Sequence, residues 1–336
     1  MTTSPRRVRF PGISSEAYEH PFAQAALSTV RKAKGFDLVL RKVMGAPGEA
    51  AMRMHHLACA VKVGDTQFPR LNQVMNEAAH TLDVVEPPSL YVNRGIGFNA
   101  VTIGFDKPFI VLGAELVDQM NEDEIRFVIG HELGHAISGH ALYQSVAWFL
   151  AAVGAGGLHG VPGGPLVLKG IELGLQDWGR KSELSGDRAG LLVGQDLEAA
   201  VRTLMMLAGG RQTAEMNPSA FLEQAAEFQD ATGLRNRIVK WMMPSSDHPL
   251  LVVRAAELDR WVREGSYSRI VHEGDYPLRG ESASVKDRLA EGLGGVGRAR
   301  ASLDAADGTA GSRLGRLGSL GSRAGDGTRG FFGRPQ

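Results

Sequence analysis

The sequence predicts a mainly helical α+β fold with one small sheet. Apolar residues recur at helical spacing through most of residues 15–85 and 121–263. Short runs rich in β-branched and aromatic residues are confined to the interval between them, at residues 90–92, 100–104 and 108–112. The chain has 336 residues, of which 43% are hydrophobic, so it can bury the core of one large domain.

The part before the sheet is expected to supply packing helices. Four are predicted, at residues 23–34, 36–43, 49–63 and 68–82. We expect residues 1–67 to form an N-terminal helical region packed on a main domain at residues 68–275. Residues 276–336 are rich in glycine, arginine and serine and cannot bury enough apolar surface to offset their ordering entropy. They are expected to be a disordered tail.

The composition excludes several classes of protein. A single cysteine, Cys59, rules out an internal disulfide and a cysteine-based metal cluster. Since it lies in the apolar run 57–61, we expect it to be a small buried hydrophobe. The formal net charge is zero and no basic patch is interleaved with aromatic residues, so no nucleic-acid partner is expected.

A core helix is predicted to begin at Asn121. Asn121 and Glu124 form a capping-box pattern, and the acidic residues between them suit the positive end of the helix dipole. Apolar positions then continue at roughly helical spacing: Ile125, Val128, Ile129, Leu133, Ile137 and Leu142. The pattern predicts one buried helix over residues 121–142.

This helix carries the pattern His-Glu-Leu-Gly-His at residues 131–135. Side chains four residues apart lie about 40° apart around a helix axis, so His131 and His135 can grip one metal ion. Glu132 projects from the flank of that pair, where a carboxylate can hold a metal-bound water. This arrangement is expected of a general base in metal-assisted peptide hydrolysis.

A catalytic zinc usually has three protein ligands, so a third ligand is needed. His140 is nearest, but nine residues at about 100° each place it opposite His131 unless the helix breaks. Downstream, Glu183 could be the third ligand, with Asp187 one turn later as a hydrogen-bond partner for a ligand histidine. Taken alone, these acids are better explained as partners of the neighbouring Arg180, Lys181 and Arg188 on an exposed helix.

The two motifs together resemble those of the gluzincin zinc peptidases, and within them the HtpX and CaaX-prenyl-protease type family. The likeness extends to Asn99-Ala100, to the run 109–113 that resembles the family's edge strand, and to Asp247-His248-Pro249 ahead of a helix containing Arg254. It spans roughly residues 68–264. Two departures are Gly186, where the family often has alanine, and Val101, where it often has an aromatic residue; both are expected to leave the metal site intact.

The resemblance implies a zincin-type peptidase domain whose edge strand flanks the active-site helix. It implies one Zn²⁺ per chain, with His131, His135 and Glu183 as ligands and Glu132 as the general base. It also implies that Asp187 orients a ligand histidine. Substrate backbone is expected to pair, as an added strand, near Asn99 and Ala100 and along residues 109–113.

His248 lies in a turn-rich loop and has three open interpretations. It could donate a hydrogen bond to the oxyanion, occupy the open position of the metal and hold the enzyme latent, or be an exposed loop histidine. The first two roles predict opposite effects of its loss on turnover.

Residues 141–169 bear on membrane contact. They carry no charged side chain before Lys169, but the glycine-rich run 156–164 interrupts any continuous span of about 20 apolar residues. Two short helices in a buried hairpin are expected, with a shallow, peripheral membrane-contact surface as the alternative. The basic N-terminus lacks the apolar core of a secretory signal, so a cytoplasmic location is expected.

These observations predict a zinc-dependent endopeptidase acting on proteins or peptides, with protein quality control as its implied setting. The alternative is a zinc-containing, chaperone-like protein that binds misfolded or membrane proteins without cutting them. An intact Glu132 favours the peptidase, because a pure binder has no need of that carboxylate.

Overall fold

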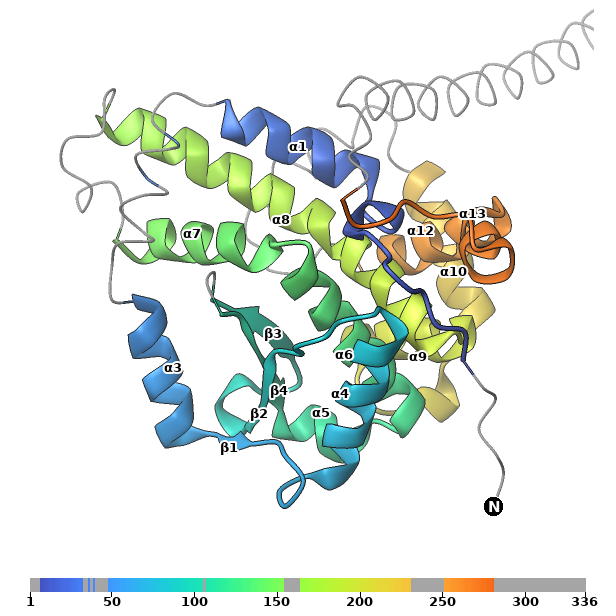
Figure 1. Cartoon of the computed structure of the whole chain (residues 1–336). Helices are drawn as coiled ribbons and strands as arrows, with labels where there is room; N and C mark the ends of the chain where they lie inside the picture. Colours follow the sequence, from blue (N-terminus) through green and yellow to red (C-terminus); the bar gives the residue numbers. More distant parts are fainter. Residues whose placement is uncertain are drawn as a thin grey trace, which may run out of the picture. The chain divides into compact units, whose positions relative to one another are not determined.

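Helices surround one four-stranded sheet (Figure 1). The computed structural model describes residues 7–32, 36, 39, 48–104, 107–153, 164–230 and 251–280. The predicted mainly helical α+β fold is confirmed, including a small sheet whose edge strand lies beside the helix of the His-Glu-x-x-His motif. His248, the glycine-rich run before residue 164 and residues 281–336 lie outside the described residues.

The helices are α1 (Pro21–Arg31), α3 (Gly48–Cys59), α4 (Pro69–Thr81), α5 (Ala114–Gln119), α6 (Glu122–Ile137), α7 (His140–Val153), α8 (Gly164–Gly194), α9 (Leu197–Gly209), α10 (Pro218–Asp230), α12 (Leu251–Arg263) and α13 (Ser266–Ser268). The strands are β1 (Val61–Lys62), β2 (Ser89–Asn93), β3 (Ala100–Ile103) and β4 (Phe109–Gly113). Single turns of 3-10 helix at Ser15–Ala17, Arg94–Ile96 and Thr213–Glu215 and a π-helical turn at Arg269–Glu273 complete the described elements.

The sheet has the order β1-β2-β4-β3. Strands β2 and β4 are parallel, and the two outer pairs are antiparallel. The expectation that residues 109–113 form an edge strand is wrong, because β4 is paired on both sides and all five of its residues are buried. An apolar run covered on both faces is typical of an interior strand. The edge beside α6 is β3.

Alternation along the strands divides the apolar side chains between the two faces of the sheet. Leu90, Ile110 and Leu112 join the main core with α4 and α6. Tyr91, Phe109 and Val111, with Val101 and Ile103, form a separate cluster on the other face. His56 of α3 packs on Phe109 there, with ring centroids 5.2 Å apart.

Cys59 departs from its predicted burial. It is exposed at the end of α3 and borders a cavity together with His55, whose Nδ1 lies 3.9 Å from its Sγ. The apolar run around it ends in a two-residue strand, β1, instead of continuing as a helix to residue 63.

Helix α6 begins as predicted and ends earlier than predicted. The Asn121 side chain accepts hydrogen bonds from the main-chain N–H groups of Asp123 and Glu124, and Oε2 of Glu124 accepts one from the N–H of Asn121. The helix ends at Ile137, Gly139 has a left-handed φ of 67°, and α7 starts at His140. The prediction of one helix through residues 121–142 is therefore wrong. His140 begins a separate helix, α7.

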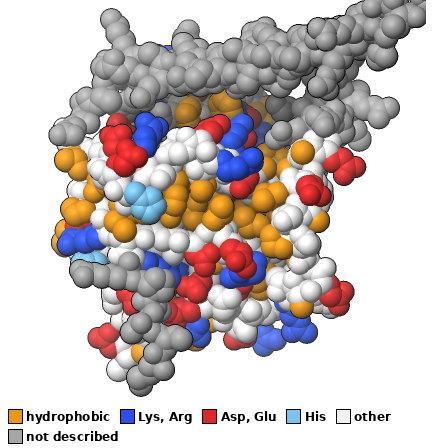
Figure 2. Space-filling model, turned by 90° about the vertical axis from the view of Figure 1, so that its right-hand side faces the viewer, with side chains coloured by type: hydrophobic (Ala, Val, Ile, Leu, Met, Phe, Trp, Pro, Cys, Tyr) orange, Lys and Arg blue, Asp and Glu red, His pale blue; other side chains and the backbone are white. Residues whose placement is uncertain are grey.

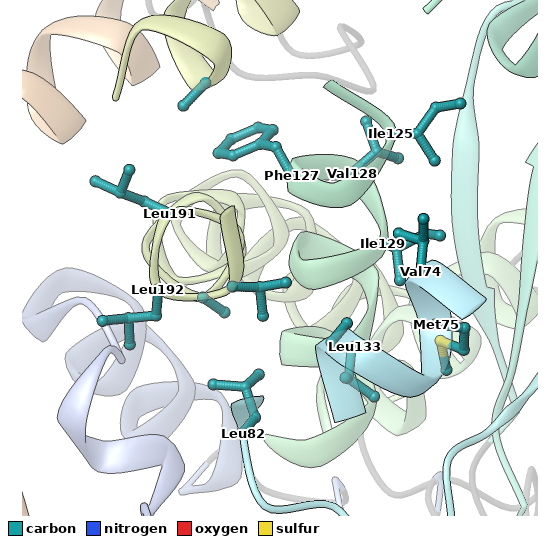
Figure 3. Close-up of a cluster of buried hydrophobic side chains, with 14 of the residues drawn as sticks. Val74, Met75, Leu82, Ile125, Phe127, Val128, Ile129, Leu133, Leu191 and Leu192 are labelled. Carbon is teal, nitrogen blue, oxygen red and sulfur yellow. The ribbon is translucent and has the colours of Figure 1, made fainter. Parts of the chain in front are cut away.

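Helix α8 packs closely on two glycines of α6. A Cβ at Gly130 would lie 2.6 Å from Cβ of Val193, and one at Gly134 would lie 2.4 Å from Cβ of Ala189. Around this contact the main core gathers apolar side chains from α4, α6 and α8 (Figure 3). The two helices are thereby held at a close, well-defined distance.

A second apolar cluster lies between α1, α7 and α8. Its members include Ala23, Val30, Tyr143, Val146, Leu150, Leu168, Ile171, Leu175 and Trp178. Residues 141–169 thus contribute buried side chains, and their second helix is the start of a 31-residue helix. Among the described helices, none combines the length and apolar content needed to cross a membrane.

The face turned to the right in Figure 1 is shown in Figure 2. Hydrophobic side chains gather in its middle, and acidic and basic side chains are interspersed around them. This face carries charges of both signs without a continuous patch of either.

Candidate metal centre

Three potential ligands converge where α6 and α8 cross. His131 and His135 come from α6 and Glu183 comes from α8. The two Nε2 atoms lie 3.1 Å apart, and the Glu183 oxygens lie 3.5 Å from each of them. Both histidines are buried, and the Glu183 side chain is 15% exposed.

These spacings fit a metal ion. Ligands about 2.1 Å from a tetrahedral zinc lie about 3.4 Å from one another. The two Nε2 atoms are 3.1 Å apart, and each lies 3.5 Å from one of the two Glu183 oxygens, Oε2 for His131 and Oε1 for His135, so the three side chains are close enough to share an ion. Two imidazole nitrogens and a carboxylate oxygen form a donor set typical of catalytic zinc sites. The residues present therefore suit zinc by chemistry and by distance.

Asp187 contacts the ring of His131. Its Oδ1 lies 3.1 Å from Nδ1 of His131, which leaves Nε2 directed toward the other two side chains. Burial acts to lower the pKa of His131, but hydrogen bonds to Asp187 and Glu183 outweigh it and raise that pKa to about 10. Asp187 and Glu183 thus stabilise a positive charge next to them. A bound metal ion would supply that charge in place of the proton on His131.

Arg254 of α12 holds both acids. It donates from Nε and Nη2 to Asp187, and its Nη1 lies 3.1 Å from Oε2 of Glu183. Burial acts to raise the pKa of Asp187, yet Arg254 outweighs that effect and the pKa is lowered. Sequence reasoning noted Arg254 only as part of a resembling segment, because a contact across 67 residues follows no local spacing.

His140 belongs to the site although the sequence placed it on the far side of the helix. Its Nδ1 lies 3.1 Å from Nδ1 of His135, and its ring meets Trp178 edge-on at 5.3 Å. Burial, followed by the neighbouring His135, holds the pKa of His140 well below its usual value. A neutral His140 can accept the Nδ1–H of His135, as Asp187 does for His131. The break at Gly139 makes this contact possible.

Glu132 is buried beside the two histidines. Its Oε2 accepts a hydrogen bond of 2.6 Å from Oγ1 of Thr102 on β3. No local pattern in the sequence points to Thr102, because the contact joins a strand to a helix 30 residues away.

Asn99 and Ala100 lie at the start of the edge strand. The Ala100 N–H donates to Oδ1 of Asn99, and the carbonyl of Asn99 accepts from the N–H of Gly113. A Cβ at Gly113 would lie 1.8 Å from the carbonyl oxygen of Gly97, so this close approach requires glycine.

A cavity of about 1540 Å³ connects these residues. Its lining includes Asn99, Ala100 and Thr102 from the sheet side, His131, Glu132, His135 and Glu183 from the centre, Trp178 from the α7–α8 side and Arg254. A smaller polar cavity around Arg7 and Gln73 shares none of these residues. The large cavity is therefore the one that a reactant could enter to reach Glu132.

Gly186 lies directly against the ring of His131. A Cβ there would lie 2.6 Å from Cε1 of His131 and 2.8 Å from both ring nitrogens. Where the resembled family often has alanine, this chain therefore leaves no room for a methyl group unless the His131 ring or the helix shifts.

Comparisons with known proteins agree with this geometry. The model of peptidase family M48 matches residues 65–262. The chain is also 32% identical over 272 residues to plastoglobule-localized metallopeptidase 48, chloroplastic, from Arabidopsis thaliana; the alignment covers 78% of this chain and 77% of that protein. No solved structure matches the chain.

Proposed function

This chain belongs to peptidase family M48 and is a metallopeptidase, and we propose that it is a zinc-dependent endopeptidase. One observation carries the proposal: His131, His135 and Glu183 converge at 3.1–3.5 Å beside the buried carboxylate of Glu132. The first three would hold the ion, and Glu132 would be the general base.

When bound, zinc would polarise the peptide carbonyl and lower the pKa of the attacking water. Glu132 would accept the proton of that water on its carboxylate and pass it to the leaving nitrogen. Asp187 and His140 would hold the two ligand imidazoles in the tautomer that presents Nε2. Arg254 would keep Asp187 and Glu183 ionised in a buried place.

The substrate is a protein or peptide, and we propose that it pairs with β3. This strand is the sheet edge next to α6, and its residues line the cavity with Glu132. An extended peptide that pairs with such an edge is held by main-chain hydrogen bonds, so its position relative to the sheet is fixed. Asn99 and Ala100 would meet the peptide at one end of the strand.

The cellular setting is part of the proposal. We propose that this is a cytoplasmic enzyme of protein quality control. The alternative is an enzyme that contacts a membrane peripherally through residues 141–169. The Arabidopsis thaliana relative is named plastoglobule-localized and chloroplastic. Cell fractionation with a detergent-free wash separates free from membrane-associated protein.

The test compares wild type with Glu132→Gln on fluorescein-labelled casein. Wild type is expected to cleave casein, to stop in the presence of a zinc chelator and to recover when zinc is restored. Glu132→Gln should keep stoichiometric zinc and wild-type stability but lose turnover on the order of 100-fold or more. Equal turnover in the two proteins would refute the mechanism, and zinc binding by wild type without cleavage would favour the binding protein.

A further inference from the structure

Thr102 makes an unusual pair of contacts with Glu132. Its side chain is buried, and Oγ1 lies 2.6 Å from Oε2 and 2.9 Å from the main-chain oxygen of Glu132. A threonine hydroxyl has one hydrogen, and the ionised carboxylate is the stronger acceptor. The hydroxyl therefore fixes one oxygen of Glu132 and leaves the other to act on a reactant.

The main chain of Thr102 faces the side of β3 on which no described strand pairs. Asn99 pairs with Gly113 by a main-chain hydrogen bond of 2.8 Å, and Thr102 pairs in register with Ile110. Antiparallel partners alternate between hydrogen-bonded and non-hydrogen-bonded pairs. Counting from Asn99, Val101 and Ile103 turn their N–H and C=O groups toward β4, whereas Ala100 and Thr102 turn theirs outward.

Thr102 differs from Ala100 at this edge. The Ala100 N–H already donates to the side chain of Asn99. Thr102 thus combines an outward-facing main chain, where an added strand would pair, with a side chain that holds the base. Both groups belong to one residue of a strand that is anchored to the buried β4.

We propose that Thr102 is a positioning residue that fixes Glu132 relative to the substrate strand. The inference rests on the proposed role of Glu132 as general base. Main-chain contacts of Thr102 would locate the peptide, and its hydroxyl would locate the carboxylate, so the two reacting partners share one reference point. A carboxylate released from this contact would spend less time in the productive geometry, and misplacement by about 1 Å can cost on the order of 100-fold in rate.

The decisive variant is Thr102→Val, which keeps the β-branched shape and removes the hydroxyl. We expect kcat on labelled casein to fall on the order of 10- to 100-fold, with KM within about twofold of wild type. Zinc content should remain stoichiometric, because Thr102 contacts none of the three proposed ligands through these hydrogen bonds. Thr102→Ser keeps the hydroxyl and should recover most of the lost kcat.

Thr203→Val is the matched control. Thr203 is also fully buried, and its Oγ1 donates to the carbonyl of Ala199 at 2.8 Å within α9, away from Glu132. Thr203→Val removes a buried hydroxyl, as Thr102→Val does, and should keep the wild-type kcat. Any small change in melting temperature that it shares with Thr102→Val measures the structural cost of the exchange.

The outcomes separate the two claims. If Glu132→Gln is inactive while Thr102→Val turns over like wild type, the inference about Thr102 is overturned and the proposed function stands. If Glu132→Gln is active, the proposed function fails. Should the valine variant not fold, Thr102→Ser and Thr102→Ala replace it, since both lack the methyl group and only serine has the hydroxyl; equal kcat in that pair overturns the inference.

Discussion

Arg254 donates two hydrogen bonds to the carboxylate of Asp187, from Nε at 2.7 Å and from Nη2 at 2.6 Å. Asp187 in turn contacts the ring of His131, so α12 is linked to α6 through α8. Three elements far apart in the sequence are joined by one buried carboxylate. The strength of this link decides how the centre responds to substitution.

Arg254→Met should destabilise the protein because it leaves the buried carboxylates of Asp187 and Glu183 uncompensated. The expected loss in the zinc-free protein is on the order of 3–5 kcal/mol in the free energy of unfolding, measured by urea denaturation. Saturating zinc should reduce the loss, since a cation would replace part of the missing charge. Arg263→Met on the same helix removes an ion pair between the exposed Arg263 and the partly buried Asp259, and it should cost less than about 1 kcal/mol. If both variants lost a similar free energy of unfolding, the buried contacts of Arg254 would contribute no more to stability than the pair of Arg263 with Asp259.

Glu183→Ala should lose stoichiometric zinc and peptidase activity together, because two histidines alone hold zinc weakly. Metal analysis after gel filtration gives the answer. Glu172→Ala, on the same helix and paired with the surface residue Lys169, should bind zinc like wild type. Full zinc retention by Glu183→Ala would require another third ligand, for which His248 is the first candidate.

His140→Phe should weaken zinc binding roughly 10- to 100-fold, the usual effect of losing a hydrogen bond to a ligand imidazole. Phenylalanine keeps a ring against Trp178 but cannot accept the Nδ1–H of His135. His140→Asn retains an acceptor and should lose less. Asp187→Ala should show a loss of similar size through His131. A competition titration with a chromogenic chelator measures all three, and unchanged affinity in His140→Phe would remove His140 from the site.

Gly186→Ala should displace the ring of His131, because the new methyl group would overlap it. We expect weaker zinc binding and lower turnover, each by about tenfold or more, with the fold retained. Gly179→Ala on the same helix is the control, since a Cβ there would meet no described atom within 4 Å apart from its chain neighbours and the backbone of its own helix turn. Wild-type affinity in Gly186→Ala would mean that α8 moves to make room.

Stability should fall as the pH drops below about 7, and His20 should contribute to the fall. Its Nδ1 accepts from the N–H of Phe22 and caps α1, so protonation would abolish the cap. Burial lowers the pKa of His20 from its usual 6.5, although Glu257 opposes the shift. The unfolded chain therefore binds more protons near pH 6.5, and the stabilisation is complete above that pH and lost below it.

His20→Asn keeps a capping acceptor without a titrating group. Its free energy of unfolding should depend less on pH between 7 and 5.5, by up to about 1.4 kcal/mol per pH unit. Identical slopes for wild type and variant, measured by urea unfolding at fixed zinc concentration, would contradict the assignment.

Local patterns predicted the parts of the site that lie on one helix. The capping box of Asn121 and the four-residue spacing of His131 and His135 are properties of a single turn or two, and the structure has both. The end of α6 was missed because one glycine in a helical pattern is tolerated, and only its left-handed φ marks Gly139 as a break. As a result the position of His140 was predicted on the wrong side.

Contacts between elements could not be predicted in the same way. Thr102 meets Glu132 across 30 residues, and Arg254 meets Asp187 across 67. No periodicity links such positions, because they are brought together by the packing of β3 and α12 on the paired helices. The run at residues 109–113 was recognised as a strand, but which strand forms the edge depends on β3 pairing beside it.

The glycine contact between α6 and α8 is also expected to limit the size of ion that would fit between the three proposed ligands. The gap between Glu183 and the two histidines follows from how closely the two backbones approach at Gly130 and Gly134. A bulkier residue at either position would push the helices apart and widen that gap. Zinc lies about 2.0–2.2 Å from its ligands, whereas calcium requires about 2.3–2.6 Å and more oxygens. We therefore expect two glycines that are not themselves proposed ligands to influence which ion size the site prefers.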